Sequence, residues 1–336
     1  MPQAHLRATL TRLRQRLAGD AEGAIRPPVG AVGAYARGAS AGWRPRYVYP
    51  EIAGYWLRWA SARPDVPHEV GERVVATLAA IQEPSGLWPT RVPLTLAGEL
   101  ASHYVAARYL FDHAMLWDGL FLWAQRRASS QAQALAALVR ASLTQFINAE
   151  SSIIAVIGEG SARWSGRAGP FSLKPLSRIV AASDASTDAV HSAFSAALPE
   201  LVNRTLHAPH AEAHPQLYAI EGLLALRLRD EAHSAFQQLL TAHGAPIKLR
   251  ETVGHGPSRS DVLAQALRVA LILAPDATRV APEWQAVVDE LIYRVDASGH
   301  IVFAPGADDS PTWAALFTEQ ALAWFAGDSP DAAAIV

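Results

Sequence analysis

The segment VYPEIAGYWLRWA, residues 48–60, decides how the chain folds. After its proline, apolar residues recur at three- and four-residue steps, which predicts a helix over 50–62. One acidic residue, Glu51, lies among the aromatic side chains. A carboxylate is costly to bury without a partner. The segment therefore predicts that Glu51 faces a central cavity, or alternatively forms a buried ion pair with Arg44, Arg46 or Arg58.

Helical periodicity continues through most of the chain, and alternating strand patterns are scarce. Breaks rich in Gly, Pro and Asp separate the periodic segments. Two segments differ: 19–48 is rich in Gly, Ala and Arg, and 150–186 has no clear helical face. We interpret 150–186 as a long ordered loop that covers or borders a cavity. The periodicity predicts helices near 3–18, 50–62, 68–82, 96–108, 110–127, 131–148, 187–206, 215–228, 230–242, 260–273, 281–294 and 311–326.

Composition narrows the class of protein. Of 336 residues, 50% are hydrophobic and 18% are charged, which allows a large core. A formal net charge of −2 provides no basic field for nucleic acid or anionic lipid. The chain has no cysteine, which excludes disulfides, thiolate metal ligands and a cysteine nucleophile.

Targeting signals are not evident in the sequence. It has no run of ~18 apolar residues and no secretory signal pattern, so we expect a cytoplasmic protein without stable membrane insertion. The basic, amphipathic segment 3–18 is interpreted as a first helix packed through its leucines. The alternative is a helix that binds a membrane surface or a partner.

The number of helices predicts the architecture. About twelve antiparallel helices with short connections, and no break in composition, favour one domain over 1–336: an all-α (α/α)6 toroid in which inner and outer helices alternate. An open solenoid has the same number of helices but should show a tighter repeat.

Five motifs resemble those of a known group of proteins, and they occur in the same order. They are YPEIAGYW (49–56), YLFDHAMLWDGLFLW (109–123), HPQLYAIEGLLAL (214–226), SDVLAQALRV (260–269) and GHIVFAPGADDSPTWAALFTEQALAWF (299–325). Together they resemble bacterial α/α-toroid proteins often found in polysaccharide biosynthesis clusters. The resemblance implies the six-hairpin toroid group, which includes glycosidases, sugar epimerases and polysaccharide lyases and borders the terpene-cyclase toroids. It also leaves room for biosynthetic partner proteins.

Four polar residues sit at or near predicted helix starts and form the candidate catalytic set: Glu51, Asp112, His214 and Asp261. In a toroid, the ends of the inner helices surround one central funnel, so we expect these four to converge there. Glycoside chemistry needs two carboxyl groups about 5–9 Å apart, one protonated and one ionised. An aromatic setting would raise the pKa of Glu51 and keep it protonated as an acid. The alternative is that the acidic residues simply stabilise helix N-termini.

His214 is a candidate general base, or a donor to a substrate hydroxyl. Its alternative is a hydrogen-bonded structural histidine. The group His207, His210 and His214 also has a spacing that permits a metal site, but prolines interrupt the segment, and we expect no metal and no cofactor. The remaining candidates are aromatic or polar residues placed to bind substrate: Trp43, Tyr49, Trp88, His113, Tyr218, Arg259, Gln265 and Trp313.

Three functions remain open. The leading hypothesis is a carbohydrate-active enzyme, an isomerase or epimerase, hydrolase or lyase, that acts on a saccharide-like small molecule. The second is a terpene-cyclase-like enzyme for an apolar or prenylated substrate. It is suggested by IQEPSGLW (81–88), which resembles a stabilising repeat of those toroids, and by the aspartates of ADDSPTWA (307–314). The third is a non-catalytic binding or scaffold toroid.

Overall fold

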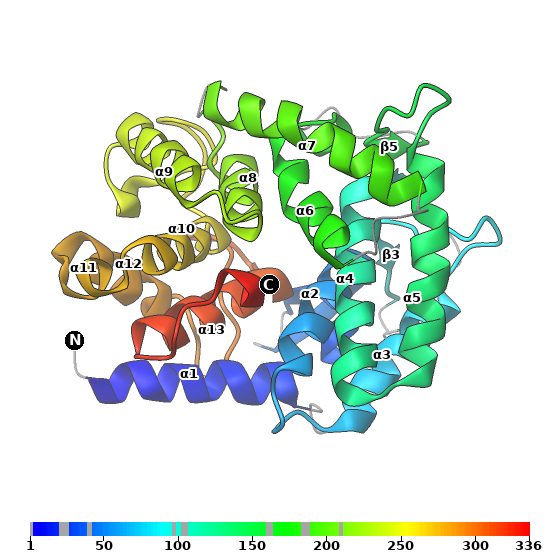
Figure 1. Cartoon of the computed structure of the whole chain (residues 1–336). Coiled ribbons are helices and arrows are strands. Elements are labelled where there is room, and N and C mark those ends of the chain that lie inside the picture. The colour runs from blue at the N-terminus through cyan, green and yellow to red at the C-terminus, as the bar shows by residue number, and fades with distance from the viewer. Residues whose placement is uncertain are drawn as a thin grey trace. The chain divides into compact units, whose positions relative to one another are not determined.

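The computed structural model describes residues 3–19, 27–38, 42–95, 99–101, 107–158, 164–182, 189–207 and 211–336 (Figure 1). The chain divides into two compact units. Unit 1 consists of Met1–Leu17, Pro170–Lys174 and Glu200–Ile335, and unit 2 consists of Ala18–Gly169, Pro175–Pro199 and Val336. The prediction of a single domain over 1–336 stays a prediction.

Unit 1 is built around one central helix, α10 (Ser260–Leu273), which contacts α8, α9, α12 and α13. Almost every residue of α10 is buried, as expected for a helix that is apolar nearly all round. α9 and α12 instead bury one face each, with charged residues on the other. The elements of this unit are α1 (Gln3–Ala18), η4 (Pro170–Ser172), α8 (Ala213–Ala225), α9 (Arg229–His243), η5 (Pro246–Lys248), α11 (Pro275–Val280), α12 (Pro282–Tyr293), β6 (Asp309–Pro311), α13 (Thr312–Phe325) and η6 (Ala332–Ala334).

Unit 2 is built around two largely buried helices that pack on each other, α2 (Pro50–Ser61) and α4 (Leu110–Arg127). α3 (His68–Ala80) and α5 (Ser130–Ser142) bury one face each. Strands β1 (Val32–Arg37), β2 (Trp43–Val48) and β3 (Val92–Pro93) form an antiparallel sheet in the order β3-β2-β1. The short strands β4 (Arg108–Tyr109) and β5 (Val156–Ile157) pair with each other. The 3-10 turns are η1 (Val29–Ala31), η2 (Leu143–Phe146) and η3 (Trp164–Gly166).

Most predicted helices are present, and three of them, 3–18, 110–127 and 260–273, have the predicted bounds. Three differences stand out. The segment 150–186 is not all loop, because Leu173–Ala182 forms α6, which precedes α7 (Ala189–His207). The β1–β2 hairpin was not anticipated in 19–48. Of the helix predicted at 96–108, residues 96–98 and 102–106 lie outside the described residues, whereas 108–109 form β4.

The contact between α2 and α4 depends on two glycines. A Cβ at Gly54 would collide with the backbone of Met115, and a Cβ at Gly119 would collide with the backbone of Gly54. The two backbones therefore approach more closely than any larger residue permits. This close approach places the first turns of α2 and α4, which carry Glu51 and Asp112, next to each other.

Replacing Gly54 by alanine is expected to destabilise the protein by roughly 1–3 kcal/mol, because the methyl group overpacks a backbone contact. Helix propensity alone would favour alanine by about 1 kcal/mol, so a loss of stability would isolate the steric term. The matched control is Gly42→Ala, whose added Cβ meets nothing within 4 Å. Denaturant unfolding of the two variants measures the difference. Equal stabilities would show that α2 and α4 can move apart at no cost.

Candidate functional site

Two carboxyl groups meet in unit 2, one from the first turn of α2 and one from the first turn of α4. Glu51 and Asp112 are 7% and 6% exposed, and their side chains are hydrogen-bonded to each other. Burial, followed by the charge of Glu51, raises the pKa of Asp112 well above its usual value. Two carboxyl groups in direct contact cannot both ionise cheaply, so the pair holds one proton between them.

Polar neighbours hold this pair in place. The Tyr49 hydroxyl donates to Glu51, and burial together with the two carboxyl groups raises the pKa of Tyr49. Thr90 hydrogen-bonds to Asp112. The guanidinium of Arg91 lies over the rings of Tyr47 and Tyr49, 4.8 and 5.2 Å from their centroids.

One atom of the pair has no partner. Asp112 Oδ2 is buried and has no hydrogen bond to any described residue. A buried carboxyl oxygen in this state costs about 1–3 kcal/mol. It is the position at which a ligand could exchange a proton with the pair. Neither Tyr49 nor Tyr109, the residues that precede α2 and α4, caps its helix through a side chain.

Two residues of unit 2 that were predicted to bind substrate lie in the protein interior. Trp88 and His113 are each 1% exposed. The Trp88 amide donates to His113 Nε2 at 3.0 Å, so Nδ1 carries the ring proton and donates to the Tyr109 carbonyl at 2.8 Å. The Trp88 indole donates to the Leu78 carbonyl, and Gln82 donates to the Gly86 carbonyl. The segment IQEPSGLW thus closes the end of α3, and neither ring has an open face for a substrate.

The buried His113 predicts a pH effect on stability. Burial lowers its pKa from 6.5 to about 4, so the unfolded chain takes up the proton first as the pH falls. Stability is complete above about pH 6.5 and declines toward pH 4; at pH 5 the loss is about 2 kcal/mol. The free energy of unfolding should be measured at pH 7 and at pH 5. Its decrease between the two should be smaller by that amount in His113→Gln than in wild type. The exposed His233→Gln is the control, and an unchanged difference in His113→Gln would contradict the neutral, buried state of His113.

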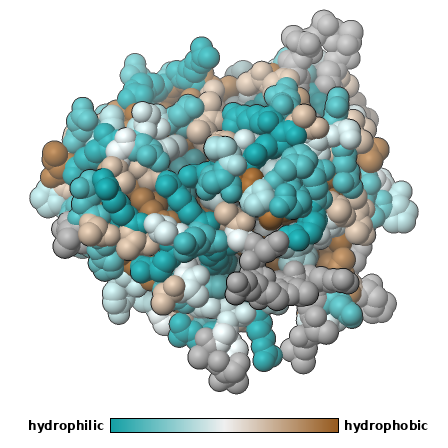
Figure 2. Space-filling view, turned by 90° about the horizontal axis from the view of Figure 1, so that it is seen from below, coloured by the Kyte–Doolittle hydropathy of each residue, from teal (hydrophilic) through white to brown (hydrophobic). Residues whose placement is uncertain are grey.

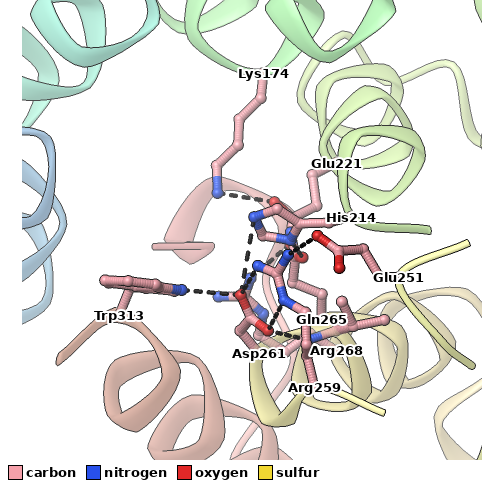
Figure 3. A network of polar contacts seen from close by, with 10 residues as sticks. Lys174, His214, Glu221, Glu251, Arg259, Asp261, Gln265, Arg268 and Trp313 are labelled. Carbon is pink, nitrogen blue, oxygen red and sulfur yellow. Dashed lines mark hydrogen bonds and ion pairs between the residues drawn. The ribbon is translucent and has the colours of Figure 1, made fainter. Parts of the chain in front are cut away.

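A separate network in unit 1 surrounds Asp261 (Figure 3). Arg259 donates to both carboxyl oxygens of Asp261, at 3.1 and 2.6 Å, and the Trp313 indole donates to Oδ2 at 2.8 Å. Although burial opposes ionisation, Arg259 and these hydrogen bonds lower the pKa of Asp261 to about 2. Asp261 is therefore a fixed anion that positions its neighbours, and it is poorly suited to donate a proton.

His214 lies beside this carboxylate. Its Nδ1 is 2.6 Å from Gln265 Oε1, its Nε2 is 3.9 Å from Asp261 Oδ2, and its ring packs on Tyr218 at 4.4 Å. Burial, aided by Arg259, lowers the pKa of His214 to about 4. His214 is therefore neutral at pH 7, as a general base or a hydrogen-bonding ligand contact must be.

Sequence reasoning missed the ion cluster next to this network. Glu221 accepts from Lys174 Nζ at 2.8 Å and from Arg268 at 2.6 Å, and all three side chains are at most 1% exposed. Lys174 also lies over the Tyr218 and Phe317 rings, at 4.5 and 5.2 Å. One signal was available in the sequence: Lys174 is one of two lysines in the chain, and it lies in an apolar segment.

A second cluster, in unit 2, also joins one carboxylate to two cationic side chains. Asp118 accepts from Arg58 at 2.7 Å and from Arg178 at 3.0 Å. Arg58 of α2 thus forms an ion pair with Asp118 of α4.

The structure brings Glu51 together with Asp112, and His214 together with Asp261, Gln265, Arg259, Tyr218 and Trp313. That both groups share one cavity stays a prediction. Trp43 is half-buried on β2, with Arg37 over its ring. Within the described residues, no three His, Asp or Glu side chains are grouped as metal ligands. His210, of the histidine group considered for a metal, lies outside them.

The fold of the chain is that of known α/α-toroid enzymes. One similar structure is Rex8A from Paenibacillus barcinonensis complexed with xylose, with a TM-score of 0.63 and 10% identity over 97% of this chain and 94% of that one. Another is the type II terpene cyclase MstE from Scytonema, with a TM-score of 0.57 and 13% identity over 95% and 98%. A third is an α-amylase from Clostridium perfringens, at 0.60 and 10% over 96% and 98%. No protein-family model and no curated protein sequence matches the chain.

These comparisons confirm the predicted fold class, an all-α (α/α)6 toroid, and the resemblance to the glycosidase-like and terpenoid-cyclase-like toroids. At 10–13% identity the likeness concerns the fold alone. Among the described residues, no helix combines the length and apolarity needed to cross a bilayer. The face in Figure 2 mixes hydrophilic and hydrophobic residues, with small and separate brown patches.

Proposed function

We propose that the chain is an enzyme that uses the Glu51–Asp112 pair as a general acid on a saccharide-like substrate. The observation that carries this proposal is the direct hydrogen bond between two buried carboxyl groups from different helices, one of which has a free, buried oxygen. Structural ion pairs join opposite charges, whereas two carboxyl groups in contact with each other are a common arrangement at catalytic sites.

The contact refines the chemistry predicted from the sequence. In glycosidases with two separate roles, the carboxyl groups stand about 5–9 Å apart, with the scissile bond between them. Glu51 and Asp112 are too close for that, so they act together as one acid. The pair donates its shared proton from Asp112. Arg91 and the Tyr49 hydroxyl stabilise the two negative charges that this step leaves on the pair, until the proton is recovered. Isomerisation, elimination and hydrolysis each have a step that needs one such acid.

The substrate class rests on two supports. Rex8A, which shares the fold, is complexed with xylose. The protein also has buried polar networks in both units, as hydroxyl-rich ligands require. A role in polysaccharide biosynthesis, a cytoplasmic location and partner proteins are part of this proposal.

A terpene-cyclase-like function is the second candidate, and one observation favours it: protonation of an alkene also needs a buried carboxylic acid, which Asp112 supplies. Asp308 of the ADDS segment does not supply it, because its side chain is exposed. A structure of MstE contains geranylgeranyl dihydroxybenzoate as substrate.

Turnover assays distinguish the two candidates. We expect the purified full chain to convert at least one member of a panel of 4-nitrophenyl glycosides, xylo-oligosaccharides and unsaturated uronosides, and to leave geranylgeranyl dihydroxybenzoate unchanged. Cyclisation of the prenylated compound, with no reaction on any saccharide, would replace the first proposal with the second.

A further inference from the structure

Arg91, at the start of β3 in unit 2, is an exposed cation held in place by two aromatic rings. Its guanidinium lies 4.8 Å from the centroid of the Tyr47 ring and 5.2 Å from that of Tyr49, and the two rings are inclined to each other by 61°. In the part of the chain that the structure describes, no side chain forms a hydrogen bond or an ion pair with this guanidinium. The rings therefore position the cation without using any of its five N–H donors.

Arg91 and the acid pair share their neighbours. Thr90, the residue before Arg91, hydrogen-bonds to Asp112. The hydroxyl of Tyr49, whose ring lies under Arg91, donates to Glu51. Both carboxyl groups also act electrostatically on the guanidinium. A ligand group bound to the donors of Arg91 would therefore lie beside the acid that the proposed reaction uses.

The charge and shape of Arg91 indicate which ligand group fits. A guanidinium matches a carboxylate in a planar contact with two parallel hydrogen bonds. In a uronic acid glycoside, the carbon that bears the carboxylate and the anomeric carbon flank the ring oxygen. One sugar ring can therefore place its carboxylate on Arg91 and its glycosidic oxygen near Asp112. The added negative charge would also favour retention of the proton by the acid pair until it is transferred.

We infer that Arg91 is the carboxylate subsite of the acid pair and that the substrate is a uronic acid glycoside. Tyr47 and Tyr49 act as positioning residues, because their rings hold the guanidinium. The sugar as ligand class rests on the proposed function. Selection of the carboxylate is instead a property of binding, and it can be measured without turnover.

Calorimetry at pH 7 with the full chain carrying Asp112→Asn tests the inference, since this variant retains the contact with Glu51 but has no proton to donate. The ligands are the methyl glycosides of glucuronate and galacturonate, their neutral counterparts from glucose and galactose, and the methyl glycoside of glucuronamide, which has the shape of the glucuronoside without its charge. At least one uronoside should bind about 10- to 150-fold more tightly than its neutral counterpart, as expected for hydrogen bonds between charged groups.

The outcomes separate this inference from the proposed function. Equal affinities within both pairs of glycosides would overturn the inference, and turnover of neutral glycosides by the wild-type protein would then leave the proposed function in place. Selective binding of a uronoside that the wild-type protein does not turn over would support the subsite and contradict the acid. Glucose 6-phosphate that binds more tightly than either uronoside would overturn the assignment of the ligand group as a carboxylate.

Substitutions of Arg91 in the same Asp112→Asn protein locate the selectivity. Arg91→Gln should abolish the preference for the uronoside and leave the affinity for the neutral glycoside unchanged, whereas Arg91→Lys, which keeps the charge without the planar fork, should restore part of it. Arg7→Gln removes an exposed arginine of α1 and should bind like the parent protein. Tyr47→Leu should weaken uronoside binding, and Tyr47→Phe, which keeps the ring, should not. A preference that persists in a folded Arg91→Gln protein would also overturn the inference.

Discussion

Asp112→Asn is expected to lower kcat/KM by about 10²- to 10⁴-fold, the usual contribution of a positioned general acid. Asparagine has nearly the same shape, and its amide can still donate to Glu51, so the contact between α2 and α4 is retained. It has no proton to transfer. Glu51→Gln should cause a loss of similar order, since the remaining Asp112 no longer shares a proton.

The pH dependence of this activity has a defined sign. Because burial and Glu51 raise the pKa of Asp112, wild-type turnover should be retained into the neutral range and fall as the pH rises through that raised value. Infrared spectra should show a protonated carboxyl band at pH 7 that is absent from Asp112→Asn. An acid with an ordinary pKa would already be ionised there.

Stability measurements separate this effect from misfolding. Burying two carboxyl groups in contact costs folding free energy, and asparagine replaces one of them with a neutral amide. Asp112→Asn should therefore leave the melting temperature unchanged or raise it. Glu69→Gln, an exposed change on α3, is the matched control and should leave turnover as in wild type. A folded Asp112→Asn protein with wild-type kcat/KM would remove the pair from the mechanism and leave a structural role for it.

How far the sequence could predict this site depends on the separation of the residues that form it. Glu51 was detectable because a carboxylate in an aromatic helix start is costly, and Asp112 because its motif repeats that pattern. Their direct contact could not be predicted from the sequence, because it depends on how closely Gly54 and Gly119 let the backbones of α2 and α4 approach. The β1–β2 hairpin was missed because Gly- and Ala-rich segments carry a weak alternating pattern.

The second limit of the sequence was that it did not predict which side chains contact each other. Asp261 was predicted as catalytic from its place at a helix start, but two side chains from other positions, Arg259 and Trp313, saturate its oxygens. Lys174 and Glu221 lie 47 positions apart in the sequence, and no local pattern pairs them. The sequence therefore indicated which residues could take part in a site. Their protonation states depend on contacts between residues that are brought together only by folding.

Glu221→Gln is expected to destabilise the protein by about 3–5 kcal/mol, the usual cost of breaking a buried ion pair by removing one partner. Glu221 is the carboxylate that Lys174 Nζ and Arg268 both contact, at 2.8 and 2.6 Å, and all three are at most 1% exposed. The amide keeps the shape of the side chain but leaves two neighbouring cations that repel each other in a medium of low dielectric constant. Denaturant unfolding at constant pH measures the change.

A second substitution shows whether charge is the cause. Lys174→Met removes one of the two cations while retaining an unbranched apolar chain over Tyr218 and Phe317, so Lys174→Met combined with Glu221→Gln should be more stable than Glu221→Gln alone. Packing defects would instead add, and the double variant would be the less stable of the two. Asp276→Asn, which removes the exposed partner of Arg279, should leave the free energy of unfolding unchanged. A Glu221→Gln protein as stable as that control would mean that water or another group already neutralises Lys174 and Arg268.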